Sequence, residues 1–182
     1  MRPEQKPVVL LTGHPGVGKT TAVRTILDRL RAHAGGFYTR EVLTAGARIG
    51  FELVTLDGAT AWLATKDMRQ SFPQEVIFGS YKVNVDAIDT VAVPSLQNAA
   101  QQGRLVVIDE IGPMELFSTT FCKTIQHILD DPGVLVFGTI VERPHPVADA
   151  VKAHPRVTVY QLTEANRDHL PAAIAAELMR LL

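Results

Sequence analysis

The chain has 182 residues, 46% of them hydrophobic, and its 18 lysine and arginine residues nearly balance 19 aspartate and glutamate residues, for a net charge of −1. This predicts one globular domain over residues 1–182 and argues against intrinsic disorder and against an obligate nucleic-acid binder. With one cysteine, no apolar run near the roughly 20 residues of a membrane span and no signal-peptide core after Met1, we expect a soluble, cytoplasmic protein.

Short apolar runs alternate with helical patterns, which is typical of an α/β fold with a largely parallel sheet. The first run, Val8–Thr12, is long enough for a strand buried on both faces. Apolar residues then recur at helical spacing from Val23 to Leu30, and we expect this helix to end at Gly35-Gly36.

A hairpin is expected next, with strands at 37–43 and 48–56 joined across Ala45-Gly46-Ala47. Asp57-Gly58 marks the turn that follows it. Residues 59–80 show no readable pattern.

The second half of the chain again alternates strands and helices. Residues 86–100 have a helical pattern, but Pro94 predicts a break near Val93. Buried strands are expected at 105–108, 134–140 and 157–162, and a closing helix from Asn166. Between the first two of these strands one helical stripe, ended by residues 131–133, comprises Phe117, Phe121, Ile125, Ile128 and Leu129.

The segment between the first strand and the first helix fits the Walker A pattern, Gly13-His14-Pro15-Gly16-Val17-Gly18-Lys19-Thr20. Its glycines let backbone N–H groups point at phosphates, and the helix that follows adds the positive end of its dipole. We expect Lys19 to contact the β- and γ-phosphates, Thr20 to ligate Mg²⁺ and Thr21 to donate to the α-phosphate. The sequence therefore predicts a nucleotide site, against the alternative of a glycine-rich turn with a solvated lysine.

Two carboxylates follow the strand at 105–108, as in the Walker B pattern. Asp109 is expected to hold Mg²⁺ through water, and Glu110 to orient and deprotonate the attacking water. The alternative is a pair of acids favoured by a helix dipole, which is less attractive beside a Walker A loop. Asp109-Glu110-Ile111-Gly112 also fits the Asp-x-x-Gly of signalling GTPases, but their guanine-reading Asn-Lys-x-Asp is not matched by Asn166-Arg167-Asp168-His169.

Several further residues are candidates for the site. Thr139, in the strand at 134–140, is expected near the γ-phosphate, against the alternative of an ordinary strand threonine. Arg143 and Arg167 are candidates to neutralise transition-state charge, although each could be a surface arginine. Asn166 and Arg167 also follow the last strand, where a base often rests.

Other residues admit a simpler interpretation. His14 in the loop contacts solvent or nucleotide, and a row at helical spacing, Arg24, Asp28 and Arg31, is explained as a solvated helix face. The aromatic residues of the middle region are expected in ordinary packing rather than in a base pocket: Trp62, Phe72, Phe78 and Tyr81.

The Walker motifs and four more particular segments, 36–42, 48–51, 114–116 and 163–167, together resemble the small P-loop nucleoside-triphosphatase family, described from thermophiles and as the cancer-related nucleoside-triphosphatase. The resemblance implies one P-loop domain of the catalytic-Glu (RecA-like) branch, with a mixed, centrally parallel sheet flanked by helices. It also implies slow, Mg²⁺-dependent hydrolysis of ATP, GTP and other nucleoside triphosphates, with nucleotide-binding segments at 13–20 and 105–112. One departure is Pro113, where the family commonly has lysine.

We therefore expect a phosphohydrolase that uses water, with Lys19, Asp109 and Glu110 as catalytic residues, nucleoside triphosphates as its partners, and a monomeric state. One alternative is a nucleotide or polynucleotide kinase, which usually needs an arginine-rich lid; the loop 142–146 holds one arginine. The other alternative is a nucleotide-dependent binding module whose hydrolysis is incidental.

Overall fold

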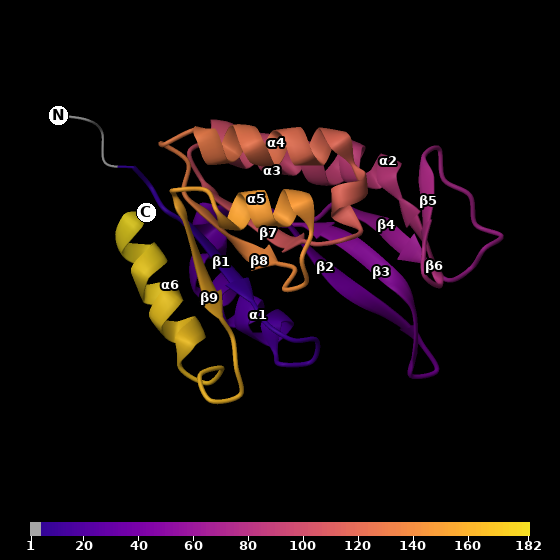
Figure 1. Ribbon diagram of the computed structural model, residues 1–182, viewed down its shortest axis with the longest axis horizontal. Helices are drawn as coiled ribbons and strands as arrows, with labels where there is room; N and C mark the ends of the chain where they lie inside the picture. The colour runs from indigo at the N-terminus through magenta and orange to yellow at the C-terminus, as the bar shows by residue number, and fades with distance from the viewer. Residues whose placement is uncertain (1–4) are drawn as a thin grey trace.

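A computed structural model describes residues 5–182, and within this range the strands form one nine-stranded sheet (Figure 1). The strands are β1 (Val8–Thr12), β2 (Ala34–Thr44), β3 (Ala47–Thr55), β4 (Thr60–Thr65), β5 (Glu75–Phe78), β6 (Tyr81–Asn84), β7 (Leu105–Ile111), β8 (Val136–Ile140) and β9 (Val157–Gln161). Their order across the sheet is β5-β6-β4-β3-β2-β7-β8-β1-β9.

The sheet has a parallel half and an antiparallel half. Neighbours in the row β2-β7-β8-β1-β9 pair in parallel, whereas β2-β3-β4-β6-β5 is built from antiparallel pairs. The predicted mixed, centrally parallel sheet is confirmed. In addition, β8 lies between β1 and β7, so a strand separates the two Walker motifs, as expected for the catalytic-Glu branch.

Helices cover both faces of the parallel half. Figure 1 shows α3 (Val93–Gln101), α4 (Thr119–Asp130) and α5 (Pro146–Lys152) on one face, and α1 (Lys19–Leu30) and α6 (Leu170–Leu181) on the other. In β1, Val8 and Leu10 pack into the first core, while Val9 and Leu11 pack into the second. Alternate residues of a strand point to opposite faces, which explains why the predicted strand is apolar throughout.

The end of the first helix differs from the prediction. Helix α1 ends at Leu30 and is followed by a short 3-10 turn, η1 (Arg31–His33), whereas Gly35-Gly36 lie inside β2. Gly36 has φ 106°, and a Cβ atom there would lie 2.2 Å from the carbonyl oxygen of Val107. These glycines therefore allow β2 to approach β7, and they do not stop the helix.

The predicted hairpin is confirmed as β2 and β3. A two-residue turn joins them, with Ala45 at φ 49° and Gly46 at φ 77°. Positive φ at both turn residues is typical of the tight hairpin turn that matches strand twist. The unreadable region 59–80 contains β4 and β5.

Near Val93 the structure shows a change of helical hydrogen-bonding pattern instead of the predicted break, because residues 85–101 are helical throughout. A single helical turn, α2 (Val85–Ala87), leads into the π-helical segment η2 (Ile88–Ala92), and Pro94 then lies in the first turn of α3. The residues before Pro94 are already helical, so the π-helical turn, and not a free helix start, accommodates the proline.

Other boundaries and exposures also differ from the predictions, and strand β8 begins at Val136 instead of at residue 134. Strand β7 continues through the two acids to Ile111, and Phe117 lies in the 3-10 segment η3 (Glu115–Phe117), 38% exposed, instead of on α4. Strand β9, expected to be buried, is the sheet edge and is only partly covered. Helix α6 begins at Leu170, after turns that occupy residues 164–169.

The sequence analysis expected neither a membrane-spanning helix nor a signal peptide, and the structure bears on the first of these expectations only. Within residues 5–182, no helix combines the length and apolar character needed to cross a bilayer. The expectation of no signal peptide concerns the beginning of the chain, and residues 1–4 lie outside the described part.

Candidate active site

The loop from Gly13 to Gly18 joins the end of β1 to the start of α1, as the Walker A pattern predicts. Gly18 is the N-cap of α1 with φ 109°, and it has no side chain to accept from the first-turn N–H groups. Those groups are therefore available to an anion. The Lys19 Nζ donates to the carbonyl oxygens of Gly13 at 2.6 Å and His14 at 3.3 Å, so it lies over the loop.

Asp109 and Glu110 lie near the carboxyl end of β7. The parallel strands β1, β8 and β7 all run in the same direction, so this end lies beside the loop that follows β1. Asp109 is buried, and the Thr139 hydroxyl of the intervening strand β8 donates to its Oδ1 at 2.6 Å. Thr139, on the strand between the two Walker motifs, therefore contacts the Walker B aspartate. Burial raises the pKa of Asp109 to about 6, with Glu110 adding to the rise and the Thr139 hydrogen bond and Lys19 opposing it.

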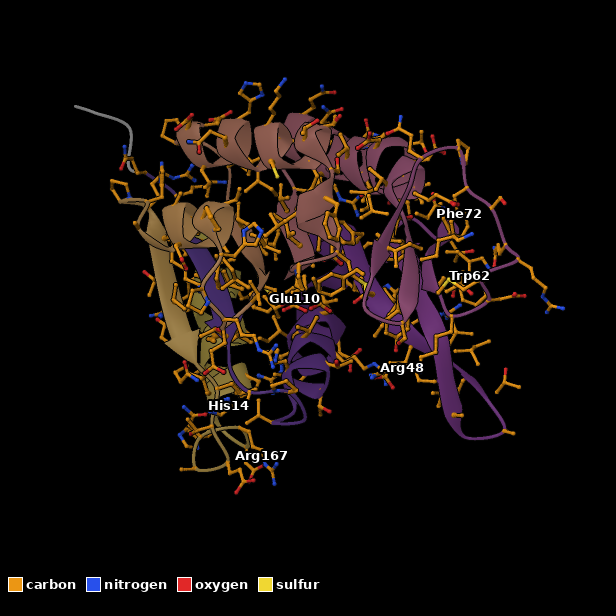
Figure 2. All side chains as sticks on the ribbon, turned by 45° about the vertical axis from the view of Figure 1, so that its right-hand side comes forward. His14, Arg48, Trp62, Phe72, Glu110 and Arg167 are labelled. Atoms are coloured by element: carbon orange, nitrogen blue, oxygen red, sulfur yellow. The ribbon has the colours of Figure 1, made fainter. Side chains whose placement is uncertain are left out.

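Glu110 is half-buried, and burial raises the pKa of its carboxyl group while the Lys19 ammonium opposes the rise. In Figure 2 it lies at the centre of the molecule, beside α1. A raised pKa brings a carboxylate closer to the range in which it accepts a proton from water, which suits a general base.

A cavity of about 550 Å³ brings the predicted groups together. Its walls include the loop and α1 on one side, β7 at its base, and the β2–β3 hairpin opposite. Of the predicted site residues, its lining contains Pro15, Gly16, Gly18, Lys19, Thr20, Asp109 and Glu110. The groups predicted to bind phosphate, to bind the metal and to accept a proton therefore line one cavity.

The remaining predicted site residues do not line this cavity: Gly13, His14, Val17, Thr21, Ile111, Gly112, Thr139, Asn166 and Arg167. His14 contacts Glu142 at 2.7 Å, and Val17 and Ile111 are buried in the core. Arg143, the other candidate for charge neutralisation, is also absent from the lining.

Asn166 and Arg167 lie on the other side of the loop. Asn166 accepts from the Thr163 N–H at 2.8 Å and donates to the Gln161 carbonyl at 2.9 Å, so it stabilises its own turn. The Arg167 side chain approaches Gly18, since a Cβ atom on that glycine would lie 3.9 Å from Arg167 Cδ. Figure 2 shows Arg167 and His14 near each other, and Arg48 across α1 from them.

The oxygen groups of Thr20 and Asp109 line the same cavity and fit a hard divalent cation such as Mg²⁺. Within residues 5–182, no group of three or more His, Cys, Asp or Glu side chains is placed to hold a metal. A cation here would take its other ligands from phosphate and water, which is how Mg²⁺ is usually held in nucleotide sites.

The opposite wall contains arginines that sequence reasoning did not assign. The Arg48 guanidinium donates to Glu41 at 2.6 Å and to the Tyr81 hydroxyl at 2.9 Å, and lies 5.1 Å from the centre of the Phe51 ring. Arg40 likewise contacts Glu52 at 2.6 Å. The signal in the sequence was that both lie in segments particular to the resembled family, 36–42 and 48–51.

A further carboxyl group, Glu115, was noticed only as part of the segment 114–116. It is 4% exposed and lies in a smaller cavity of about 180 Å³ that Glu110 also lines. Burial and the nearby Glu110 raise the pKa of Glu115 to about 8. At neutral pH its carboxyl group is mostly protonated.

None of the four aromatic residues of the middle region lines the 550 Å³ cavity, although Tyr81 contacts two residues that do, Arg48 and Phe51. Phe78 packs on Phe117 with ring centres 5.7 Å apart, and Tyr81 packs on Phe51 at 5.4 Å. Neither Trp62 nor Phe72 lines the 550 Å³ cavity. The packing of Phe78 and Tyr81 on neighbouring rings agrees with the expectation of ordinary packing.

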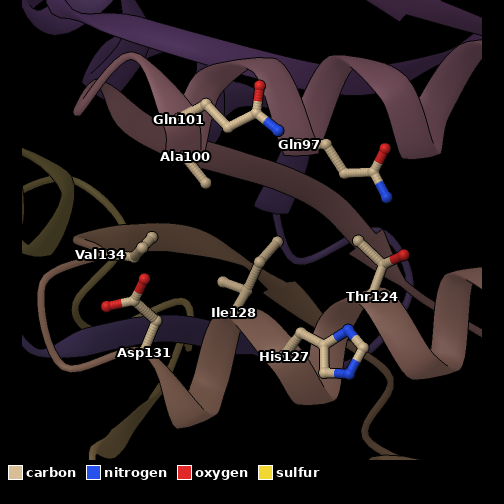
Figure 3. A pocket seen from close by; sticks show the side chains of 8 residues that line it. All are labelled: Gln97, Ala100, Gln101, Thr124, His127, Ile128, Asp131 and Val134. Carbon is tan, nitrogen blue, oxygen red and sulfur yellow. The ribbon is translucent and has the colours of Figure 1, made fainter.

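A separate cavity of about 180 Å³ lies between α3 and α4 (Figure 3). Its lining includes Gln97, His127 and Asp131, and it shares no residue with the loop or with β7. It is therefore not part of the candidate site.

Comparisons with known proteins agree with this geometry. The family described as NTPase matches residues 8–175. The nucleoside-triphosphatase THEP1 of Thermotoga petrophila is 41% identical over 162 residues, covering 89% of this chain and 87% of that protein. The cancer-related nucleoside-triphosphatase of Homo sapiens is 39% identical over 173 residues, covering 89% and 91%. The crystal structure of THEP1 from the hyperthermophile Aquifex aeolicus superposes with a TM-score of 0.82 at 36% identity, covering 94% and 98%.

Proposed function

The chain belongs to the NTPase family and is a nucleoside-triphosphate hydrolase, and from this premise we propose that its hydrolysis depends on Mg²⁺, is slow and accepts several bases. The observation that carries the proposal is the shared cavity of Lys19, Thr20, Asp109 and Glu110. Each of these groups has one part in the reaction.

Binding of the phosphates begins at the loop. The uncapped N–H groups at the start of α1 accept the negative charge of the triphosphate, and the dipole of α1 adds to the attraction. Lys19, which now donates to two loop carbonyls, exchanges them for the β- and γ-phosphate oxygens. A chain with net charge −1 thus binds a polyanion through local donors.

Thr20 and Asp109 would hold Mg²⁺, Asp109 through water. The ion supplies neutralisation of the charge that develops on the β- and γ-phosphate oxygens. The Thr139 hydroxyl keeps the Asp109 carboxylate oriented toward the cavity, because its donor engages one of the two carboxylate oxygens.

Glu110 orients the attacking water and accepts its proton. As the oxygen of water bonds to the γ-phosphorus, the bond to the bridging oxygen breaks and the diphosphate leaves. Burial raises the pKa of the Glu110 carboxyl group, with Lys19 opposing the rise, and a carboxylate with a raised pKa is a stronger base toward the attacking water.

Broad base selection is supported by the loop at 163–167. Each end of the Asn166 amide is already engaged by a backbone group of its own turn, which restricts the orientation in which it could read the edge of a base. No other base-reading motif is visible in the sequence.

Slow turnover is supported by the state of the arginines that face Glu110. Arg40 and Arg48 are held by Glu52 and Glu41, and those ion pairs would have to open before either guanidinium could neutralise transition-state charge. Arginines placed on the γ-phosphate are worth several powers of ten in rate, so their engagement elsewhere favours a low kcat.

We also propose a monomer in the cytoplasm. The single cysteine suits a reducing compartment. Light scattering coupled to size exclusion tests the first statement.

The experiment that tests the proposal is phosphate release from the four ribonucleoside and four deoxyribonucleoside triphosphates, each with Mg²⁺ and with chelator. We expect turnover of most of them within about tenfold of each other, and loss of turnover in chelator. Strong preference for one base, or full turnover without a divalent cation, would contradict the proposal.

A further inference from the structure

Glu115 is a buried carboxyl group to which the reaction described above assigns no part. It begins η3, the short 3-10 segment that follows β7, and it is 4% exposed. Within residues 5–182, no lysine, arginine or histidine nitrogen lies within 4 Å of its carboxyl oxygens. Burying a carboxyl group without a cationic partner is costly, so its position calls for a reason.

Two cavities meet at Glu110. Thr39, Phe51 and Glu110 line both the 550 Å³ cavity and the cavity of about 180 Å³ in which Glu115 lies. We call the smaller one the rear cavity; Glu115 lines it and does not line the larger one. The Glu110 carboxyl group therefore borders both spaces. Only an orientation toward the larger cavity lets it accept a proton from a water molecule beside the phosphates.

The rear cavity offers Glu115 few polar partners. Besides the two glutamates and Thr39, its lining is apolar: Phe51, Leu63, Pro113 and Met114. The charged groups that act on the Glu115 carboxyl group are Glu110 and Asp109, both on β7. Since an ionised carboxylate accepts stronger hydrogen bonds than a neutral group does, Glu110 is the strongest side-chain acceptor that lines this cavity.

The side chains of Glu110 and Glu115 are neighbours across Gly112. A Cβ atom on Gly112 would lie 2.8 Å from Glu115 Oε2 and 3.2 Å from both Cγ and Cδ of Glu110. The two side chains thus flank the same point from different directions. Because the residue at this point is glycine, the chain places no side chain between the two carboxyl groups.

Two ionised carboxylates this close in a buried place repel each other, which favours an uncharged form for one of them. Burial, the largest cause, and the neighbouring Glu110 raise the pKa of Glu115 to about 8, while the backbone N–H groups of Glu115 and Gly112 oppose the rise. Glu110 is the more exposed of the two. The proton therefore stays on Glu115 at neutral pH, and an uncharged carboxyl group has an O–H that donates.

We propose that Glu115 is a positioning residue for Glu110: its O–H donates to one oxygen of the Glu110 carboxylate and keeps the other oxygen turned toward the 550 Å³ cavity. The proposal rests on the part of Glu110 as the base, given above. Glu115 itself does not contact water or phosphate, because it lines only the rear cavity. A base held in its reactive orientation loses less freedom on the way to the transition state, so the benefit appears in kcat and not in KM.

Steady-state hydrolysis of GTP with Mg²⁺ by the 182-residue chain tests the proposal. Glu115→Leu has no donor, and we expect kcat to fall about 10- to 100-fold, as for loss of a hydrogen bond to a charged group, with KM within about twofold. Glu115→Gln is uncharged and retains an N–H donor, so its kcat should stay within about threefold of that of the unmodified protein. An unchanged kcat for Glu115→Leu, or an equally low kcat for both variants, overturns the proposal.

A double-mutant cycle with Glu110→Gln separates positioning from a general structural effect. If Glu115 acts through Glu110, Glu115→Leu should change the rate by less than about twofold in a chain that already carries Glu110→Gln. Single-turnover measurements with enzyme in excess record these low rates. A loss as large as that in the unmodified background shows that Glu115 acts independently of Glu110, which overturns the proposal.

Arg156→Met is the matched control for a loss of stability. Arg156 is also buried, at 8% exposed, and it lies outside both cavities, so this change should leave kcat and KM unaltered. A fall in kcat as large as that of Glu115→Leu would attribute both effects to stability and overturn the proposal. Thermal unfolding shows whether each variant folds, and Glu115→Met, with an unbranched side chain, replaces Glu115→Leu if the latter does not.

The Glu110→Gln variant alone distinguishes failure of this inference from failure of the proposed function. If it hydrolyses GTP at the unmodified rate, Glu110 is not the base, and the positioning of Glu110 by Glu115 is overturned together with it. If Glu110→Gln is impaired while Glu115→Leu is not, the base stands and the positioning residue alone is refuted.

Discussion

Glu110 differs from its neighbour Asp109 in exposure and in contacts, and this difference decides its role. Asp109 is buried and bonded to Thr139, while Glu110 is half-buried and faces the open cavity. Glu110→Gln keeps the shape and loses the ability to accept a proton. We expect turnover to fall about 10²–10⁴-fold with nucleotide binding retained, measured by phosphate release and by equilibrium binding of a non-hydrolysable analogue.

Lys19→Ala is the variant to compare with Glu110→Gln, because Lys19 is proposed to bind the phosphates and Glu110 to accept a proton from water. It should weaken binding and turnover together. Turnover by the Glu110→Gln variant equal to that of the unmodified protein would show that Glu110 is not the base.

Glu115 gives a prediction about pH and stability. Its pKa is about 8 in the folded protein, against an ordinary value of 4.5, so between these values the folded chain keeps a proton that the unfolded chain loses. The free energy of unfolding therefore falls as pH rises from about 4.5 to 8. Glu115→Gln cannot ionise, and we expect it to exceed the unmodified protein in unfolding free energy by ~1–3 kcal/mol at pH 8.

Urea unfolding at pH 5 and pH 8 measures this difference. At pH 5 the gain should largely disappear, since Glu115 is then protonated in the folded protein. The exposed Glu164→Gln is the control and should show no such pH dependence. A gain for Glu115→Gln that is equal at both pH values would contradict a buried, protonated carboxyl group.

The residues of the Walker motifs were predictable because their spacing along the chain fixes their geometry. Lys19 and Thr20 follow the loop directly, and Asp109 and Glu110 end a recognisable apolar run. Arg48 could not be predicted as a cavity residue, because its position depends on how the β2–β3 hairpin extends the sheet past β7. Arg24, Asp28 and Arg31 are all exposed, so the interpretation of this row as a solvated helix face is confirmed.

At the scale of elements, Arg156 joins segments that are distant in sequence. It is 8% exposed, and its guanidinium donates to five backbone carbonyls, those of Lys6, Ile128, Leu129, Asp131 and Val134. Several of these are last-turn carbonyls of α4, which have no partner inside the helix. Arg156 therefore holds the end of α4 against the start of β8 and the segment before β1.

Arg156→Met fills a similar volume without donors and leaves these carbonyls unsatisfied. We expect the free energy of unfolding to fall by ~2–4 kcal/mol, measured by urea denaturation. Nucleotide affinity of the folded variant should be unchanged, since Arg156 is outside the 550 Å³ cavity. Arg29→Met, at an exposed position, is the control, and an equally small effect of both changes would refute the structural role of Arg156.

The elements show where sequence patterns stop being informative. Buried parallel strands such as β1 and β8 are evident as apolar runs, because both of their faces are covered. The sequence suggested that Gly35-Gly36 end the helix. Glycine is needed at Gly36 because a side chain would clash with β7, and β7 is about 70 residues away in sequence. The edge strand β9 was overestimated as buried because sheet order is not a local property.

At the scale of the molecule, the loop, the metal ligands and the base all belong to the parallel half of the sheet, and they assemble only when β1, β8 and β7 are paired. The unfolded chain has no such arrangement, so nucleotide binds the folded state alone and stabilises it. With Mg²⁺ and a non-hydrolysable triphosphate at about 100 times Kd, the gain is about 2.7 kcal/mol, which for a chain of this length raises Tm by roughly 5–10 °C. Omitting Mg²⁺ should reduce the shift, because the affinity falls. Lys19→Ala should show little shift at the same concentration, and a shift equal to that of the unmodified protein would place the triphosphate somewhere other than the Walker A loop.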